Sequence, residues 1–314
     1  MSKSRAFDHV SLVIPTYNAG PFVPDLLRNL ATQGLAPTQI LIIDSSSRDS
    51  TATSFREFGA RVVVIPQSEF NHGGTRRLGT DLTAPSEFII FLTQDAIPAH
   101  PEAFSKLLAA FANPTVGMAY GRQLPRRTAR AIERHARMTN YPASETEIRN
   151  FEDRAKLGVK TTFCSNSFAA YRRSSLLDVG GFPQDAPFAE DQITAGKMLL
   201  KGWSVAYAGD ACVTHSHGYS IAEEFRRYFD IGVFHARNSW LLESFGRAEG
   251  EGLRFIGSEM RYLLRHEPWS IAEAVAKTFA KYGAYRLGLV EHLFAPKIKA
   301  HLSMFPAYWQ ARSK

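Results

Sequence analysis

The strongest constraint on the fold is a series of short apolar runs that alternate with helical patterns. The runs are rich in β-branched and aromatic residues, and they are VSLVI (10–14), QILIID (39–44), RVVVI (61–65) and FIIFL (88–92). Such runs are typical of strands that are buried on both faces of a parallel sheet. Helical patterns lie between them, at residues 21–33, 49–58 and 74–82. We therefore predict an α/β fold with an open, Rossmann-like, doubly wound and mostly parallel sheet.

Polar residues follow each of the four predicted strands. Ligands of doubly wound sheets bind at the carboxyl ends of the strands, so these segments are expected to meet at one edge. The segments are PTYN (15–18), DSSSRD (44–49), PQSEFNHGGTRR (66–77) and TQDA (93–96). The pattern predicts a polar ligand site at this edge of the sheet.

The alternation weakens after residue 98. The patterns predict a helix at residues 101–113 and a strand at 116–121. A basic stretch at 122–160 is predicted to be helical or loop-like and to cover the site. A further strand at 165–173 and a helix at 189–203 follow. Two strand-like runs, VAYAG (205–209) and ACVTHSH (211–217), follow. From residue 220 onward the pattern is helical and is interrupted by prolines. We predict an α/β domain over residues 1–219 that carries the site, and a helical, basic segment over residues 220–314.

Charge and cysteine content narrow the class of protein. Of 37 Lys and Arg residues, 10 lie in residues 253–314, where only 4 of the 30 Asp and Glu residues occur, so the surplus of +7 is almost all C-terminal. This distribution, without a recognition motif, argues against nucleic-acid binding. Cys164 and Cys212 have no metal-binding spacing and are interpreted as buried thiols. No signal peptide or membrane-spanning run is visible, so a cytoplasmic location is expected.

Four ordered motifs carry a resemblance to a known family. VSLVIPTYNAG (10–20), IIDSSSRDST (42–51), TQDA (93–96) and AEDQ (189–192) resemble the motifs of GT-A glycosyltransferases of family 2, which are inverting enzymes that use nucleotide sugars. FNHGGTRR (70–77), FAEDQ (188–192) and THSHGYS (214–220) are similar to signatures of bacterial rhamnosyltransferases of O-antigen and related polysaccharide pathways. The resemblance implies a GT-A fold with a C-terminal helical extension.

The first two loops are expected to contact the nucleotide. The resemblance places Pro15, Tyr17 and Asn18 in the donor site, and Asp44 can accept hydrogen bonds from a base imide or a ribose hydroxyl. The alternative is that Asp44 forms an Asx turn. In the family a second acid often touches the base, but this sequence has Ser45 there.

The third loop combines glycines with basic residues at the start of a helix. Backbone N–H groups and the helix dipole favour anions at such a position. We expect His72, Gly73 and Arg76 to line the donor pocket, with Arg76 contacting the diphosphate or sugar. A Gly-rich turn with solvated arginines is the alternative.

The fourth loop carries a single carboxylate. The D-x-D motif of the family is reduced here to Gln94-Asp95-Ala96, so Asp95 alone is predicted as a ligand of Mg²⁺ or Mn²⁺, and Gln94 as a donor contact. One carboxylate suffices when the diphosphate supplies further oxygens. His217 is predicted as a second metal or phosphate ligand and His215 is ranked below it; a structural role for both is the alternative.

The E-D motif is predicted to carry the catalytic base. Inverting transfer needs a base that takes the proton from the acceptor hydroxyl, and the family pattern assigns this part to Asp191. Glu190, Ser165 and Asn166 are predicted acceptor contacts. The alternative for the two acids is that they favour the start of their helix through its dipole.

The basic C-terminal segment leaves three possibilities open. Apolar residues recur at helical spacing from residue 269 onward, interleaved with Lys and Arg. These residues fit amphipathic helices that pack on the domain. They also fit a surface that binds an anionic inner leaflet, near a polyprenyl-diphosphate-linked acceptor. The third possibility is a contact between copies of the chain.

The combined prediction is transfer of L-rhamnose from dTDP-β-L-rhamnose to a hydroxyl of a glycan, in O-antigen or other cell-surface polysaccharide synthesis. The nearest alternative is a GT-A enzyme that uses another nucleotide sugar, such as a UDP-hexose. A nucleotidyltransferase would share the sheet but is expected to carry a phosphate loop with a Lys, which PTYNAGPF lacks. A non-catalytic glycan-binding protein would not need Asp95 and Asp191 together.

Overall fold

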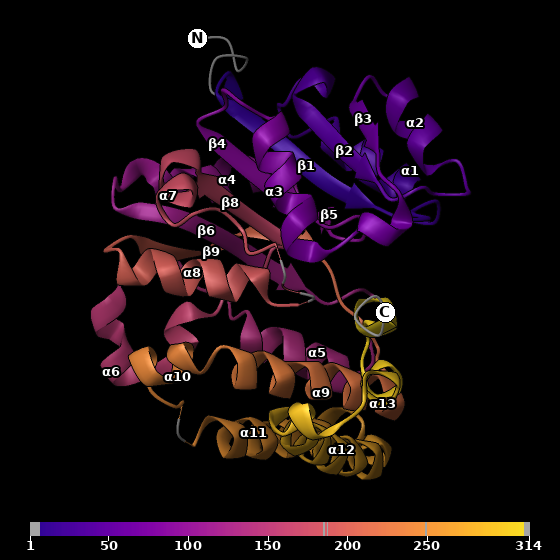
Figure 1. Cartoon of the computed structure of the whole chain (residues 1–314), viewed down its shortest axis with the longest axis vertical. Coiled ribbons are helices and arrows are strands. Elements are labelled where there is room, and N and C mark those ends of the chain that lie inside the picture. The colour runs from indigo at the N-terminus through magenta and orange to yellow at the C-terminus, as the bar shows by residue number, and fades with distance from the viewer. Residues whose placement is uncertain (1–6, 185, 187, 249, 311–314) are drawn as a thin grey trace.

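One extended sheet forms the centre of the molecule. The computed structural model describes residues 7–184, 186, 188–248 and 250–310 (Figure 1). Its strands are β1 (Val10–Thr16), β2 (Ile40–Asp44), β3 (Arg61–Val64), β4 (Phe88–Leu92), β5 (Ile97–Pro98), β6 (Val116–Leu124), β7 (Glu147–Arg149), β8 (Phe168–Arg172) and β9 (Ser204–Thr214). Within the described part of the chain they form a nine-stranded sheet in the order β3-β2-β1-β4-β8-β6-β9-β5, with β7 paired to β9.

The first four strands pair in parallel, as the sequence predicts. β1 lies between β2 and β4, with Leu12 opposite Ile40 and Val10 opposite Phe88, and β2 pairs with β3. β8 then runs antiparallel to both β4 and β6, whereas β6 and β9 are parallel to each other. The carboxyl ends of β1, β2 and β4 therefore meet at one edge, where the loops of the predicted site begin.

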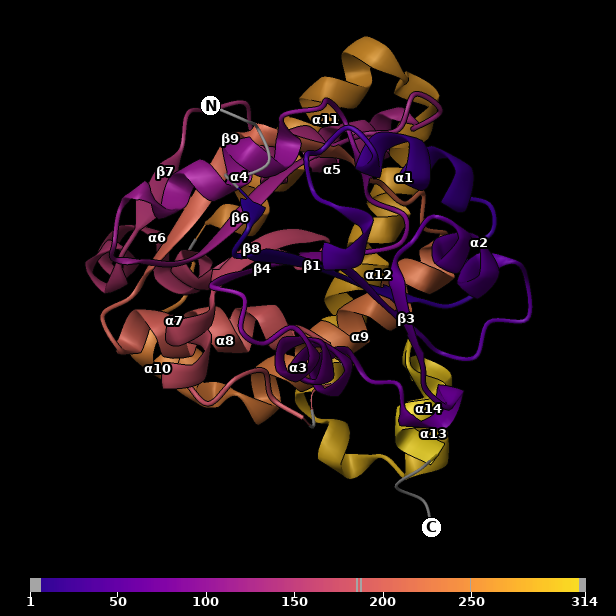
Figure 2. The ribbon, with the colours of Figure 1, turned by 90° about the horizontal axis from the view of Figure 1, so that it is seen from above.

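Helices cover both faces of the sheet. They are α1 (Val23–Leu30), α2 (Thr51–Glu57), α3 (His72–Leu82), α4 (Ala103–Ala109), α5 (Ala131–Asn140), α6 (Arg154–Leu157), α7 (Arg173–Asp178), α8 (Glu190–Leu200), α9 (Ile221–Arg237), α10 (Ser239–Phe245), α11 (Glu251–His266), α12 (Ile271–Leu289), α13 (Pro296–Leu302) and α14 (Pro306–Gln310). Helices α1, α2 and α4 lie on one face and α3, α7, α8 and α10 on the other (Figure 2). Their apolar side chains form a core on each face. This two-sided packing confirms the predicted doubly wound α/β architecture.

The second half of the sheet differs in detail from the sequence prediction. The two strand-like runs after residue 204 are one strand, β9, which pairs with β6 through a register shift next to Gly121. Gly209 sits in the middle of β9, where a Cβ would lie 2.2 Å from the carbonyl oxygen of Ser144. Gly209, which ends the first of the two predicted runs, therefore permits a close approach between β9 and the segment at Ser144. The basic stretch from residue 122 contains the end of β6 together with α5, β7 and α6.

The C-terminal helices form a layer beside α5, on the side of the molecule away from β1–β3 (Figure 1). Helices α9 and α12 pack closely because Gly232 and Gly288 face each other's backbones: a Cβ on either would lie within 2.3 Å of a carbonyl oxygen of the other helix. α11 packs on α5 through Leu263 and Ile132. In the described residues, every helix is too short or too polar to cross a membrane. The predicted division of the chain after residue 219 stays a prediction.

Candidate active site

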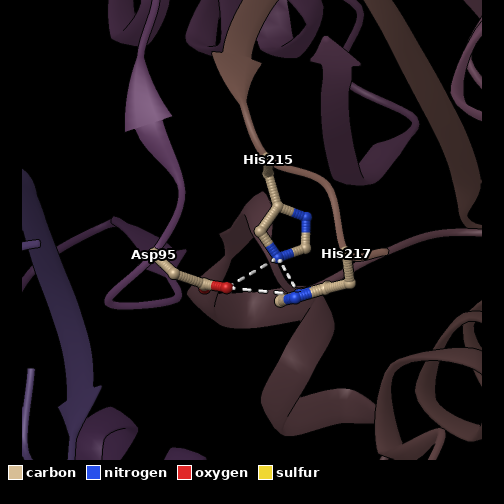
Figure 3. A group of neighbouring side chains, drawn as sticks. All are labelled: Asp95, His215 and His217. Carbon is tan, nitrogen blue, oxygen red and sulfur yellow. Dashed lines mark hydrogen bonds and ion pairs between the residues drawn. The ribbon is translucent and has the colours of Figure 1, made fainter. Parts of the chain in front are cut away.

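Three side chains at one end of β9 and β4 could hold a metal ion. Asp95 follows β4, and His215 and His217 follow β9, so the sheet brings residues more than a hundred positions apart to one point. Their ligand atoms lie within 4.8 Å of one another, and the Asp95 Oδ2 atom is 3.3 Å and 3.2 Å from the Nε2 atoms of His215 and His217 (Figure 3). The described residues hold no other such group of His, Cys, Asp or Glu.

Hydrogen bonding orients His215 as a ligand. Its Nδ1 atom lies 2.9 Å from the Gln123 Oε1 atom, which also accepts a hydrogen bond from Arg137. Because that oxygen can only accept, Nδ1 carries the proton and the neutral ring presents a lone pair at Nε2. This lone pair faces the Asp95 carboxylate, an arrangement that a cation between the two atoms would stabilise.

Electrostatics keeps the Asp95 carboxyl ionised. Burial acts to raise its pKa, but the contacts with His215 and His217 hold the pKa of Asp95 well below its usual range. Burial lowers the pKa of His215 even though the Asp95 carboxylate opposes this shift. An ionised carboxylate and a neutral imidazole are the protonation states that a metal site needs.

Hydrogen bonds hold the loops after β1, β2 and β4 together. Gln94 accepts a hydrogen bond from the Tyr17 N–H and donates one to the Tyr17 carbonyl. Asn18, at φ 47°, binds the second loop through Ser47 and Arg48. The polar residues predicted at the strand ends thus lie side by side, and several of them position one another.

Asp44 is buried, and both of its carboxylate oxygens bind within the chain. They accept hydrogen bonds from the Thr16 hydroxyl at 2.9 Å and from the backbone N–H and hydroxyl of Ser47 at 2.8 Å and 2.6 Å. This is the turn geometry that the sequence offers as the alternative to a nucleotide contact. In this structure Asp44 orders the second loop.

A pocket of about 240 Å³ opens at this edge of the sheet. It is lined by Pro15, Thr16, Tyr17, Ser45, Gln67, Phe70, His72, Arg76, Thr93 and Gln94. Three of the lining side chains have a buried polar atom without a hydrogen-bond partner: Ser45 Oγ, Arg76 Nε and Thr93 Oγ1. Buried polar atoms normally have partners, so such a cluster is typical of a site that a polar ligand completes. Neither Ser45 nor Thr93 was predicted as a site residue: Ser45 stands where the family often has a base-contacting acid, and the hydroxyl of Thr93 gave no distinctive signal.

A buried ion pair links this pocket to the E-D motif. The Arg76 Nη1 atom lies 3.0 Å from Glu190 Oε1, and both side chains are almost fully buried. The Asn166 amide also donates to Glu190. Burial acts to raise the pKa of Glu190, but Arg76 and His72 lower it below its ordinary value. Glu190 is therefore ionised.

Asp191 is the half-buried neighbour of that carboxylate. It accepts hydrogen bonds from the backbone N–H groups of Asn166 at 2.9 Å and Gln192 at 2.8 Å. Burial, together with the charge of Glu190, raises the pKa of Asp191 to about 7. Ala189, just before the two acids, has a left-handed backbone at φ 58°. Strained backbone of this kind at the start of α8 fixes the direction of the acids.

Three predicted site residues, Gly73, Asn166 and Ser165, make contacts within the protein. A Cβ on Gly73 would lie 1.8 Å from the carbonyl oxygen of Pro183, so this glycine permits close packing of α3. Asn166 is buried and binds Glu190, Asp191 and Tyr171. Ser165 accepts a hydrogen bond from Gln123, which connects the E-D motif to the His215 side of the metal group.

Comparison with known proteins identifies the family. Residues 11–180 match the family described as glycosyl transferase family 2. This chain belongs to that family. It is 43% identical, over 96% of its length and 96% of the relative, to the O-antigen chain rhamnosyltransferase RfbN of Salmonella typhimurium. It is also 43% identical to the O-antigen chain rhamnosyltransferase WbaN of Salmonella anatum, over 95% of both chains. The predicted membership of the family and the prediction of a glycosyltransferase are confirmed.

Solved structures confirm the GT-A fold. This family 2 glycosyltransferase resembles the mannosyltransferase PcManGT from Pyrobaculum calidifontis, solved with GDP-Man and Mn²⁺, with a TM-score of 0.56, 20% identity, and coverage of 97% of this chain and 86% of that one. It also resembles residues 1–349 of S. aureus TarS, with a TM-score of 0.51, 17% identity, and coverage of 97% and 87%. At these identities the likeness concerns the fold.

Proposed function

We propose that this glycosyltransferase moves L-rhamnose from dTDP-β-L-rhamnose to a hydroxyl of a glycan, with inversion at C1, in the synthesis of O-antigen or a related cell-surface polysaccharide. The identity of 43% to O-antigen chain rhamnosyltransferases over nearly the whole chain supports rhamnose as the transferred sugar. The geometric observation that carries the reaction type is the pair of carboxylates in opposite surroundings: Asp95 lies within 3.3 Å of two imidazoles, and Asp191 is held by backbone N–H groups next to Glu190. An inverting transfer needs positive charge at the leaving diphosphate, which a cation held by Asp95 would supply, and a base at the acceptor.

Asp95, His215 and His217 would hold a divalent metal in this proposal. The fit rests on the ionised carboxylate and on the unprotonated Nε2 of His215 that faces it. A set of two imidazoles and one carboxylate suits Mn²⁺ better than Mg²⁺, which prefers oxygen ligands. When bound, the metal supplies charge stabilisation for the diphosphate as it leaves.

The pocket at the edge of β1, β2 and β4 is the proposed donor site. Tyr17, which is 37% exposed, offers a ring on which the thymine base can stack. The unpartnered Ser45 Oγ, Thr93 Oγ1 and Arg76 Nε atoms provide hydrogen-bonding groups for the donor. Arg76 also neutralises Glu190, so it serves the donor side and the acceptor side together.

Asp191 is the proposed base. With a pKa near 7 it is about half ionised at neutral pH, and a base tuned close to the working pH is the most effective. It accepts the proton from the acceptor hydroxyl as that oxygen attacks C1. Glu190 stays ionised and raises the proton affinity of Asp191, so Glu190 acts through its neighbour.

The acceptor is proposed to be lipid-linked, and the protein to work at the cytoplasmic face of the inner membrane. Exposed apolar side chains on α11 and α12 support contact with a lipid surface: Leu253 is 78% exposed, Phe279 74% and Tyr282 63%. A contact between two copies of the chain competes with this interpretation. Two measurements on Phe279→Ser separate the interpretations. Co-sedimentation with vesicles that contain anionic lipid should weaken in the first case, and sedimentation velocity without lipid should show a dimer that dissociates in the second.

A screen of nucleotide sugars tests the donor assignment. The melting temperature is measured with dTDP-rhamnose, UDP-glucose and GDP-mannose, each with and without Mn²⁺. A ligand that binds only the folded state raises the melting temperature, and at the same concentration a tighter ligand raises it more. We expect the largest metal-dependent rise with dTDP-rhamnose. A rise with UDP-glucose and none with dTDP-rhamnose would reject the proposed donor.

A further inference from the structure

A second cavity, separate from the donor pocket, reaches the metal group. Its volume is about 440 Å³, and its walls come from α5, α9, α11 and α12. It reaches the metal group at His217 and Gly218, and the buried Tyr141 and half-buried Phe163 line it nearby. The donor pocket is lined by Gln94, the residue before Asp95. Each cavity thus includes a residue that belongs to, or is next to, the Asp95–His217 contact.

This cavity contains a buried carboxylate without a partner. Glu259, on α11, is 3% exposed and lines the cavity, and among the described residues its side chain has no hydrogen-bond or ion-pair partner. Lys277 pairs with Glu273 at 2.9 Å and Lys281 with Glu224 at 3.4 Å, so both lysines are closer to other carboxylates. Their charges act to lower the pKa of Glu259, but burial outweighs them and raises it. The Glu259 carboxyl therefore lines the cavity with hydrogen-bonding capacity that a ligand can use.

The lining as a whole fits a neutral, hydroxyl-bearing ligand. It contains five basic side chains, Arg130, Arg137, Arg227, Lys277 and Lys281, and five acidic ones, Glu133, Glu223, Glu224, Glu259 and Glu273. Such a balance does not favour an anion. Aromatic residues complete the walls: Tyr141, Phe163, Tyr219, Tyr228 and Phe255. Aromatic faces together with carboxylates that accept from hydroxyls suit the apolar ring faces and polar edges of a sugar.

We propose that this cavity binds the acceptor saccharide, with Glu259 accepting hydrogen bonds from hydroxyls of a sugar unit next to the one that reacts. The proposal rests on the proposed function, since it names the substrate of the same reaction centre. It also assigns acceptor recognition to residues outside the E-D motif. Ser165 and Asn166, which the sequence suggested for this task, are engaged in holding the centre together.

Tyr141, which lines the cavity, is close enough to Asp191 for the two charges to interact, so the cavity extends towards the proposed base. The reacting hydroxyl lies at the His217 end, where its oxygen forms a bond to C1 of the donor sugar. The bond between C1 and the diphosphate oxygen breaks, the electron pair leaves with dTDP, and the proton passes to Asp191. Glu259 contacts no reacting atom and sets only the affinity for the acceptor.

Binding and kinetics of Glu259→Gln test the proposal. The change keeps the size of the side chain and replaces a buried carboxyl, whose burial is costly, by a neutral amide, so the variant is expected to fold. The matched control is Glu243→Gln, which alters an exposed glutamate on α10. The probes are p-nitrophenyl glycosides of galactose, mannose, glucose, rhamnose and glucuronic acid. Binding of the glycosides is followed by saturation-transfer NMR with dTDP and Mn²⁺ present. Their activity as acceptors is followed as the rate of rhamnose transfer from dTDP-rhamnose.

We expect at least one neutral glycoside to bind the wild type and the control, with affinity lower by about tenfold in Glu259→Gln, as for the loss of a charged hydrogen bond. The dissociation constant of dTDP-rhamnose should not change. Unaltered glycoside binding in Glu259→Gln, binding of none of the glycosides by the wild type, or preference for the glucuronide would overturn the inference. Wild-type protein that binds no dTDP-rhamnose at all would instead reject the proposed function.

Discussion

Asp95 and Asp191 are the same chemical group in two opposite environments. Asp95 contacts two imidazoles, and these contacts hold its pKa well below the ordinary range. Asp191 lies beside the ionised Glu190 in a partly buried position, and its pKa rises to about 7. Burial acts to raise the pKa of both carboxyls, so the neighbouring groups decide whether the pKa ends up low or high.

The comparison teaches how one site can hold a cation and accept a proton at the same pH. A carboxylate that stays ionised at all working pH values suits a permanent electrostatic task. A carboxylate that titrates near neutrality suits proton transfer. Each prediction below alters one side of this comparison and leaves the other intact.

The largest effect is expected from Asp191→Asn. The amide cannot take a proton, so the transfer rate should fall by about 10³-fold, within the range for loss of a general base. Donor binding should persist, because Asp191 does not line the donor pocket. Rates with dTDP-rhamnose and a purified acceptor measure the effect. Turnover equal to that of the wild type would rule out this base.

Asp95→Asn should have the next largest effect. It removes the only carboxylate of the metal group among the described residues, and we expect kcat/KM to fall by about 10²-fold, or roughly 3 kcal/mol. The rise in melting temperature caused by Mn²⁺ alone should disappear. Asp25→Asn, on the exposed surface of α1, is the matched control. An unchanged response to Mn²⁺ would show that the metal binds elsewhere.

Gln123→Met tests the orientation of His215. Methionine has a similar size but offers the His215 Nδ1 proton no comparable acceptor. Changes to such supporting residues typically cost 10–100-fold in metal affinity. We expect the Mn²⁺ dissociation constant, measured by calorimetry, to rise by about tenfold while the pH dependence set by Asp191 stays the same. Wild-type Mn²⁺ affinity would mean that another contact orients the ring.

The pH dependence of kcat should follow Asp191. As the pH falls below a pKa of about 7 the carboxyl becomes protonated, so kcat is expected to fall by about fivefold between pH 7 and pH 6 and by about tenfold per pH unit below that. Because its folded-state pKa is raised, the stability contributed by this group is present at low pH and is lost as the pH rises through about 7. Asp191→Asn should therefore gain relative stability above pH 7. A kcat profile that is flat down to pH 5 would contradict this assignment.

The sequence predicts the first half of the fold well because its strands are buried on both faces. The runs at residues 10–14, 39–44, 61–65 and 88–92 leave little choice of structure, and all four occur as parallel strands. The family motifs then indicate Asp95 and Asp191 directly. Beyond residue 116 the strands pair with partners far away in the chain, and the single strand β9 could not be recognised across Gly209.

Other parts of the site depend on contacts that the sequence does not encode locally. His215 and His217 are two positions apart in an extended segment, and only the fold shows that both face Asp95. Gln123 carries no motif, and its role follows from its contact with His215. Glu259 resembles any surface glutamate of an amphipathic helix until the packing of α11 against its neighbours buries it.

The most direct test asks whether Asp95 serves metal binding and Asp191 serves proton transfer. It is calorimetric titration of dTDP-rhamnose, with Mn²⁺ present, into the wild type, Asp95→Asn and Asp191→Asn. Asp191→Asn should bind the donor with wild-type affinity, within about twofold. Asp95→Asn should bind it about as weakly as the wild type does after chelation of the metal. Loss of donor affinity in Asp191→Asn, or metal-dependent donor binding that survives in Asp95→Asn, would contradict the account.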